Sequence, residues 1–179
     1  VQNFRDLGGY PSYSTKKQMR WGMIYRSAEI DSLECSSRRE LKNLGIKTLI
    51  DLRASSEIGR QSPLQKGFNV VHIPLATGDM EGILKGIREE KIKSDTVYRM
   101  VERMNRILID QYTKEYRQIF DILLDKNSYP VVIHCSSGKG RTGIVSALVL
   151  AALGINEDII MEDYRLSNDY FNIPSASKY

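Results

Sequence analysis

Apolar and polar positions follow two different spacings along this chain. Short apolar runs bounded by turn-forming residues predict strands at 20–27, 46–52, 68–75 and 130–134. Apolar residues at helical spacing predict helices over 80–127, 143–153 and about 157–171. Because strands alternate with helices, the pattern predicts an α/β fold with a mostly parallel sheet.

Turn and cap signals refine this pattern near the N-terminus. Residues 3–10 contain two adjacent glycines and predict a loop. Ser37 and Glu40 have the spacing of a capping box, which predicts the start of a short helix that Gly45 ends.

The chain length fits one domain. Its 179 residues are enough for a sizeable core, so we expect a single domain over 1–179. The helical stretch at about 80–113 is expected to be an insertion within it. A lid over a site is one interpretation of this stretch, and ordinary helix packing is the favoured one.

Composition and charge narrow the classes of partner. Hydrophobic residues make up 41% and charged residues 27%, as in ordinary globular proteins. A net charge of +4 suits an anionic substrate, or simply a slightly basic exterior. No run of Lys and Arg resembles a nucleic-acid stripe, and the longest apolar run, 144–153, is too short to span a bilayer. We therefore expect neither a nucleic-acid partner nor a transmembrane segment.

The two cysteines, Cys35 and Cys135, are too few for a disulfide framework. Cys135 would have to be a free thiolate to react, whereas Cys35 is interpreted as structural or as a protective disulfide partner. The chain begins at Val1 without Met and looks trimmed, so a cytoplasmic and a secreted location both stay open.

The candidate chemistry lies at residues 130–143. An apolar strand ends before Cys135, five residues separate it from Arg141, and an apolar helix follows. A strand's carboxyl end is the usual place for a ligand in a parallel α/β sheet. Cys135 is the candidate nucleophile, and Arg141 supplies a planar fork that matches two phosphate oxygens.

The loop between these two residues has the composition of an anion nest. Successive backbone N–H groups can converge on an anion there, and the N-terminus of the following helix adds positive potential. Gly138 and Gly140 are expected to allow backbone angles that other residues resist. The predicted phosphate-binding residues are Ser136, Ser137, Gly138, Lys139, Gly140, Arg141 and Thr142.

The same positive potential would favour the Cys135 thiolate. The Thr142 hydroxyl is expected to donate a hydrogen bond to its sulfur. Two rival sites fit poorly: a nucleotide-binding loop requires Lys followed by Ser or Thr, and His134 with one Cys offers too few ligands for zinc.

This loop resembles the Cys-x5-Arg signature of the protein-tyrosine phosphatase superfamily. Residues 3–10, 25–27 and 51–53 with Glu57 further resemble a bacterial branch of tyrosine phosphatase B-like enzymes and related lipid phosphatases. The resemblance implies a four- or five-stranded, mostly parallel sheet flanked by helices, and neither a metal nor an organic cofactor. It also implies a phosphocysteine intermediate, with a phosphorylated protein or a phosphoinositide as substrate. Inorganic phosphate or sulfate is expected to occupy the loop.

One position departs from that branch, which often carries Asp between the loop's Lys and Arg. Gly140 stands there, as in phosphoinositide phosphatases of the eukaryotic kind. A general acid must then come from elsewhere. Asp79, just past the strand at 68–75, is the chosen candidate, with a turn or helix-cap role as its alternative. Asp51 and Asp6 are the other candidates, although Asp51 is better interpreted as a buried partner of Arg53 or Arg26.

Four functions are weighed on these residues. The leading one is a phosphatase for phosphotyrosine, with dual specificity for phosphoserine and phosphothreonine open. A phosphoinositide or inositol-phosphate phosphatase is the second, with Lys139 either contacting a further phosphate or facing solvent. A silent phosphate-binding module and a sulfur- or arsenate-handling enzyme rank lower. His72 and His134 are interpreted as packing or loop-bracing residues.

Overall fold

The computed structural model describes residues 1–30, 35–58, 67–76, 86, 89 and 94–170. Five strands form one sheet in the order β1-β2-β5-β3-β4, and every neighbouring pair except β1 with β2 is parallel. The mixed, mostly parallel sheet confirms the predicted fold class. Its strands are β1 (Arg5–Asp6), β2 (Ile24–Ser27), β3 (Thr48–Asp51), β4 (Asn69–His72) and β5 (Val131–His134).

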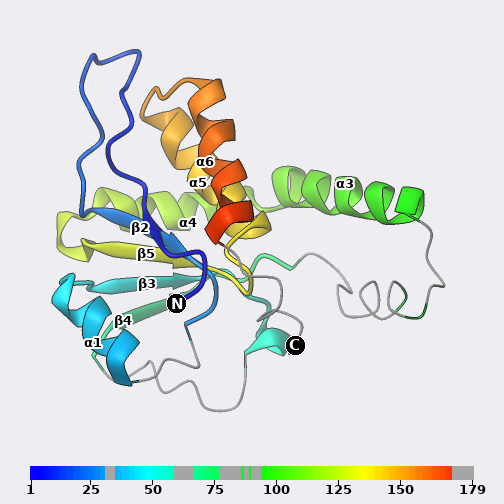
Figure 1. Ribbon diagram of the computed structural model, residues 1–179, viewed down its shortest axis with the longest axis horizontal. Helices are drawn as coiled ribbons and strands as arrows, with labels where there is room; N and C mark the ends of the chain where they lie inside the picture. The colour runs from blue at the N-terminus through cyan, green and yellow to red at the C-terminus, as the bar shows by residue number, and fades with distance from the viewer. Residues whose placement is uncertain (31–34, 59–66, 77–85, 87–88, 90–93, 171–179) are drawn as a thin grey trace.

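Helices cover both faces of this sheet (Figure 1). One face packs on α1, and the other packs on α4, α5 and α6 with the end of α3. The described helices are α1 (Cys35–Asn43), α3 (Ser94–Gln111), α4 (Thr113–Leu124), α5 (Gly140–Ala152) and α6 (Glu157–Tyr170), with 3-10 turns η1 (Ser55–Glu57) and η3 (Lys126–Ser128).

The central strand β5 is buried along its whole length. Val131 and Ile133 belong to the core beneath α4 and α5, while Val132 faces the core beneath α1. A strand enclosed on both faces needs apolar residues at every position, which explains its continuous apolar sequence.

The four parallel strands end in line. Ser27, His134, Asp51 and His72 pair across the sheet as the last residue of each strand. The residues that follow therefore emerge together at one edge, and Cys135 is the central one.

Several predicted boundaries need correction. The helix α5 begins at Gly140 rather than 143, so Arg141 lies in its first turn. The helix α1 begins at Cys35, two residues before the proposed capping residue Ser37. The predicted loop at 3–10 contains β1, a strand too short to leave an alternating pattern in the sequence.

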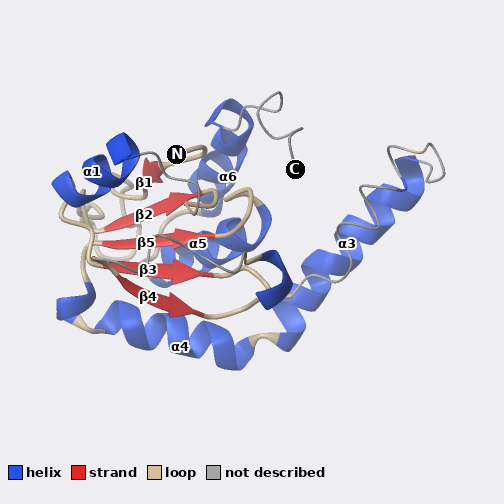
Figure 2. Ribbon diagram, turned by 90° about the horizontal axis from the view of Figure 1, so that it is seen from below, coloured by secondary structure: helices blue, strands red, loops and turns tan. Residues whose placement is uncertain are grey.

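The helical prediction for 80–127 is confirmed over α3 and α4. Figures 1 and 2 both show α3 running away from the sheet. Met104 and Leu108 near its end are buried, whereas Tyr98 is 74% exposed. The lid interpretation of this stretch stays a prediction. None of the described helices is long and apolar enough to cross a membrane.

Candidate active site

The predicted nucleophile and the predicted phosphate ligand lie at the two ends of one loop. Cys135 follows β5 directly, and Arg141 is the second residue of α5. Their exposed fractions are 1% and 9%. The loop therefore joins a buried strand to a helix N-terminus, the arrangement in which backbone N–H groups and a helix dipole favour an anion.

The two loop glycines are not equivalent. Gly138 has φ +68°, and a Cβ there would lie 2.4 Å from the backbone carbonyl carbon and oxygen of Ser27. A Cβ on Gly140 would have no atom within 4 Å, and the φ of Gly140 is not positive. The expectation that both glycines supply special backbone angles is confirmed for Gly138 and is wrong for Gly140.

Three successive carbonyls of the loop are bonded to residues outside it. The Glu29 N–H donates to Ser136 O at 3.1 Å, and Asn3 Nδ2 donates to Ser137 O at 3.0 Å. The carbonyl of Gly138 accepts a 2.8 Å bond from Arg26 Nη2.

These bonds fix the direction of the loop's N–H groups. In a trans peptide the C=O and the following N–H point in opposite directions. The carbonyls of residues 136–138 face their outside donors, so the N–H groups of residues 137–139 face the other way. This orientation is what an anion nest requires.

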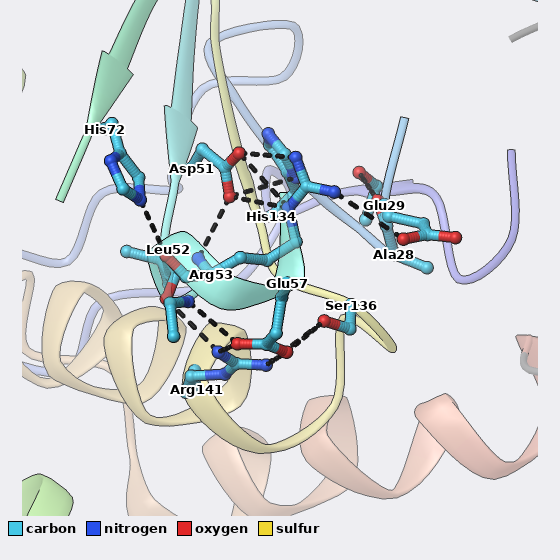
Figure 3. A network of polar contacts seen from close by, with 12 residues as sticks. Ala28, Glu29, Asp51, Leu52, Arg53, Glu57, His72, His134, Ser136 and Arg141 are labelled. Atoms are coloured by element: carbon cyan, nitrogen blue, oxygen red, sulfur yellow. Dashed lines mark hydrogen bonds and ion pairs between the residues drawn. The ribbon is translucent and has the colours of Figure 1, made fainter. Parts of the chain in front are cut away.

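Glu57 holds the guanidinium of Arg141 (Figure 3). Its two carboxylate oxygens accept bonds from Arg141 Nη1 at 2.5 Å and Nη2 at 2.7 Å. Glu57 Oε1 also accepts a 2.6 Å bond from the Ser136 hydroxyl. One carboxylate thus links the beginning of the loop to its end and fixes the plane of the guanidinium.

Glu57 and Arg141 each stabilise the charged form of the other. Burial raises the pKa of Glu57, but the bonds from Arg141 and Ser136 outweigh it and lower that pKa to about 2. Burial lowers the pKa of Arg141, but Glu57 and the nearby Cys135 sulfur raise it above its ordinary value. Both groups are therefore charged at neutral pH.

Asp51 forms a second carboxylate–guanidinium pair beside the first, also visible in Figure 3. Arg53 Nη2 lies 2.6 Å from Asp51 Oδ2, which confirms Arg53 as its buried partner. Burial raises the pKa of Asp51, but the bonds from Arg53 outweigh it and hold that pKa below its ordinary value. The Arg53 carbonyl is 2.7 Å from His72 Nε2, and His134 Nδ1 lies 4.0 Å from Asp51, so both histidines brace this pair.

The remaining predicted site residues do not share one location. Asp6 accepts bonds from the N–H groups of Gly8 and Gly22, which places its carboxylate in the β1–β2 connection. Lys139 Nζ donates to Asn168 Oδ1 of α6 at 2.7 Å. Asp79 lies outside the described residues.

The Thr142 hydroxyl is fully buried. Within the described part of the chain it has no hydrogen-bond partner, so the expected bond to the Cys135 sulfur is absent from this structure. The described residues also contain no group of three or more His, Cys, Asp or Glu side chains placed to hold a metal.

Reasoning from the sequence did not assign a role to Glu57 or Asn3, and it named Arg26 only as an alternative partner of Asp51, which is wrong because Arg26 is bonded to Asp163. All three occur in the segments that carry the family resemblance, but the loop residues that they contact lie between 79 and 134 residues away in the chain. The available signal was position: Glu57 follows the end of a predicted strand closely, at the edge where the loop also emerges.

Comparison with known proteins matches this chain to phosphatases. A sequence model described as "Tyrosine phosphatase family" matches residues 1–178. The triple specificity protein phosphatase PtpB of Mycobacterium tuberculosis is 32% identical over 93% of this chain, which spans 67% of that protein. A tyrosine-protein phosphatase of Nostoc commune is 25% identical over 81% of this chain, which spans 48% of its length.

Solved structures show a more distant likeness. P. aeruginosa TpbA in complex with pTyr is 16% identical, and the alignment covers 88% of this chain and 76% of TpbA with a TM-score of 0.46. Tk-PTP is 18% identical, with 82% and 78% covered and a TM-score of 0.45. The match of the family model over nearly the whole chain carries the assignment: this chain belongs to the tyrosine phosphatase family, a family of hydrolases.

Proposed function

We propose that this protein is a cysteine-dependent phosphomonoester phosphatase that acts on phosphotyrosine through a phosphocysteine intermediate. The observation that carries the proposal is the loop that begins at Cys135 and ends at Arg141. Its three carbonyls are bonded to residues outside the loop, so the opposite N–H groups point the other way, and we expect them to bind an anion there together with the guanidinium of Arg141, which would meet two phosphate oxygens.

The first chemical step transfers the phosphoryl group to sulfur. The Cys135 thiolate attacks phosphorus, the S–P bond forms and the bond between phosphorus and the substrate oxygen breaks. The leaving oxygen takes a proton from a general acid. The loop N–H groups and Arg141 stabilise the charge on the three non-bridging oxygens during transfer.

The second step restores the enzyme. Water attacks phosphorus and loses a proton to a base, which is the same acid in its ionised form. The S–P bond breaks, and inorganic phosphate and the Cys135 thiolate result. After the second step the Cys135 thiolate and the protonated general acid are both restored, so the enzyme can begin another turnover.

Asp79 is proposed as the general acid. The carboxylates of Asp51 and Glu57 are bonded to arginines that lower their pKa values, so neither carries a proton at neutral pH. Asp6 is engaged with two backbone N–H groups away from the loop. These observations favour a donor from another segment, and Asp79 follows β4 in the sequence, a strand whose last residue, His72, lies at the edge where the loop emerges.

Asp79→Asn tests this role. A missing proton donor matters most when the leaving group is a poor one, so we expect the variant to slow an alkyl phosphate by about 10²–10⁴-fold. An aryl phosphate with an acidic phenol should be slowed much less. Steady-state rates on both substrates, with wild type as reference, give the ratio. Equal slowing of the two would remove Asp79 from this role.

The substrate class follows from the relatives and from one residue. The names of the relatives include a triple specificity protein phosphatase and a tyrosine-protein phosphatase. Phosphotyrosine is therefore the proposed substrate. Lys139 favours a second candidate, a phosphoinositide, because its ammonium group is held beside the loop by Asn168 and could meet a further phosphate.

A substrate panel separates these functions. Phosphate release is measured from a phosphotyrosine peptide, a phosphoserine peptide, a soluble phosphoinositide and an inositol phosphate, with wild type and Cys135→Ser. We expect release that depends on Cys135 and is greatest for phosphotyrosine. Greatest release from the phosphoinositide would favour the second candidate. No release from any of them by reduced protein would leave only a phosphate-binding module.

A further inference from the structure

A buried polar network lies beneath the phosphate loop and includes residues that the mechanism does not use. Its centre is Asp163 of α6, a carboxylate 1% exposed. Two arginines from the N-terminal part of the chain converge on it. Arg26 Nη1 lies 2.5 Å from Asp163 Oδ2, and Arg5 Nε lies 3.2 Å from Oδ1.

Both arginines also reach the loop, each by a different route. Arg26 spans the gap itself, because its other terminal nitrogen, Nη2, donates to the carbonyl of Gly138. Arg5 acts through Asn3: Arg5 Nη1 donates to Asn3 Oδ1, and Asn3 Nδ2 donates to the carbonyl of Ser137. The same carboxylate is thus connected to two successive loop peptides.

The packing of α5 against α6 brings Asp163 to this place. A Cβ on Gly143 would lie 2.8 Å from the Tyr164 ring and 3.5 Å from Arg26 Nη2. A larger residue there would separate the helices and move the carboxylate away from Arg26. Burial lowers the pKa of Arg26 below its ordinary value, and the Asp163 carboxylate opposes part of this effect, so the ion pair favours the charged form of this enclosed guanidinium.

We infer that Asp163, Arg26 and Asn3 are positioning residues for phosphate binding: they hold the carbonyls of Ser137 and Gly138 away from the anion position. Losing either donor frees a peptide to rotate, and a rotated carbonyl would face the phosphate with its negative end. The network contains two arginines and one carboxylate, so it also leaves one net positive charge under the loop. This inference rests on the proposed phosphate-binding role of the loop.

Two conservative variants test it without removing the central charge. Arg26→Lys keeps a cation beside Asp163. Its single ammonium group replaces the two terminal nitrogens that bond Asp163 and Gly138, so we expect it to lose the bond to Gly138. Asn3→Asp keeps the shape and the oxygen that faces Arg5, but it loses the donor to Ser137 and adds a negative charge that cancels the net positive charge of the network. Tyr10→Phe is the matched control, because its hydroxyl bonds to Asp163 Oδ1 at 3.2 Å and has no hydrogen bond to the loop among the described residues.

The measurement is the dissociation constant of inorganic phosphate in the Cys135→Ser background, by titration calorimetry, with the melting temperature of each protein. We expect Arg26→Lys and Asn3→Asp to weaken phosphate binding at least about fivefold, the loss typical of one buried hydrogen bond. In the active background both should raise KM for a phosphotyrosine peptide. Asp163→Asn should weaken binding more than either, and Tyr10→Phe should stay within about twofold of its parent.

The outcomes separate the network from the function it serves. If the parent Cys135→Ser protein binds no phosphate, the proposed function fails and the inference falls with it. If the parent binds phosphate and the folded Arg26→Lys and Asn3→Asp proteins bind it equally well, the inference alone is overturned. Equal weakening by Tyr10→Phe would also overturn it, because the effect would then reflect general loss of packing.

Discussion

The two halves of the loop between Cys135 and Arg141 are shaped in different ways. In residues 136–138, backbone carbonyls are bonded to Glu29, Asn3 and Arg26, which lie more than a hundred residues away in the chain. In residues 140–142 the backbone already belongs to α5, with Lys139 as the capping residue, and the side chains of Lys139 and Arg141 make the hydrogen bonds to other segments. The first half is therefore sensitive to anything that changes its backbone, and the second half to which side chain it carries.

A pair of glycine substitutions is the strongest test of this difference. Gly138→Ala places a methyl group 2.4 Å from the Ser27 backbone at a positive φ. Strain of about 1–3 kcal/mol and overpacking of a similar size should lower both stability and activity. We expect kcat/KM to fall at least about 100-fold, because the N–H groups lose their alignment.

Gly140→Ala is the matched control in the other half. Its new methyl group meets no atom within 4 Å, and alanine is the better helix former by about 1 kcal/mol. We expect kcat/KM within about threefold of wild type and no loss of melting temperature. If the two variants behaved alike, the loop would not be divided as we describe.

Glu57→Gln removes the charge that orients Arg141. The amide can accept one bond from the guanidinium in place of a charged bidentate pair, so we expect kcat/KM to fall about tenfold, mainly through binding. If kcat/KM fell by less than about twofold in steady-state assays, Arg141 would not need this charged partner.

The same variant has a pH signature. The pKa of Glu57 is lowered to about 2 from an ordinary value of 4.5, so its stabilising effect is complete above pH 4.5 and is lost as the pH falls toward 2. Between pH 5 and pH 3 the melting temperature of wild type should therefore fall further than that of Glu57→Gln, when the two proteins are scanned side by side. Parallel losses would contradict the assignment.

Lys139→Ala should have the smallest effect. The ammonium group is bonded to Asn168 at the surface, and an exposed contact of this kind contributes little stability. For a phosphotyrosine peptide we expect a change in kcat/KM below about threefold. A much larger loss on a phosphoinositide than on the peptide, measured with the same preparation, would show that Lys139 contacts a second phosphate.

The sequence allowed prediction of the parts of this site that are encoded locally. Cys135 and Arg141 are close in the chain, and the apolar strand and helix around them show which way the loop faces. The supporting residues could not be paired, because Glu57, Arg26 and Asp163 meet their partners only through the packing of the whole sheet. Gly140 was misjudged for another reason: a glycine in a sequence does not reveal its φ angle.

Asp163 did leave one signal. With Ile159, Ile160 and Ser167 it follows the helical spacing of the face that packs inward. A carboxylate on such a face requires a cationic partner, and the sequence offers many arginines. Only the structure selects Arg5 and Arg26.

The central claim is that Cys135 carries the phosphoryl group, and a trapped intermediate tests it most directly. Wild type is mixed with a radiolabelled phosphotyrosine peptide, quenched within one turnover, digested and mapped, with Cys135→Ser treated in the same way. We predict label on the peptide that contains Cys135 in wild type and none in the variant. Turnover without labelled cysteine, or turnover that survives in Cys135→Ser, would contradict the account.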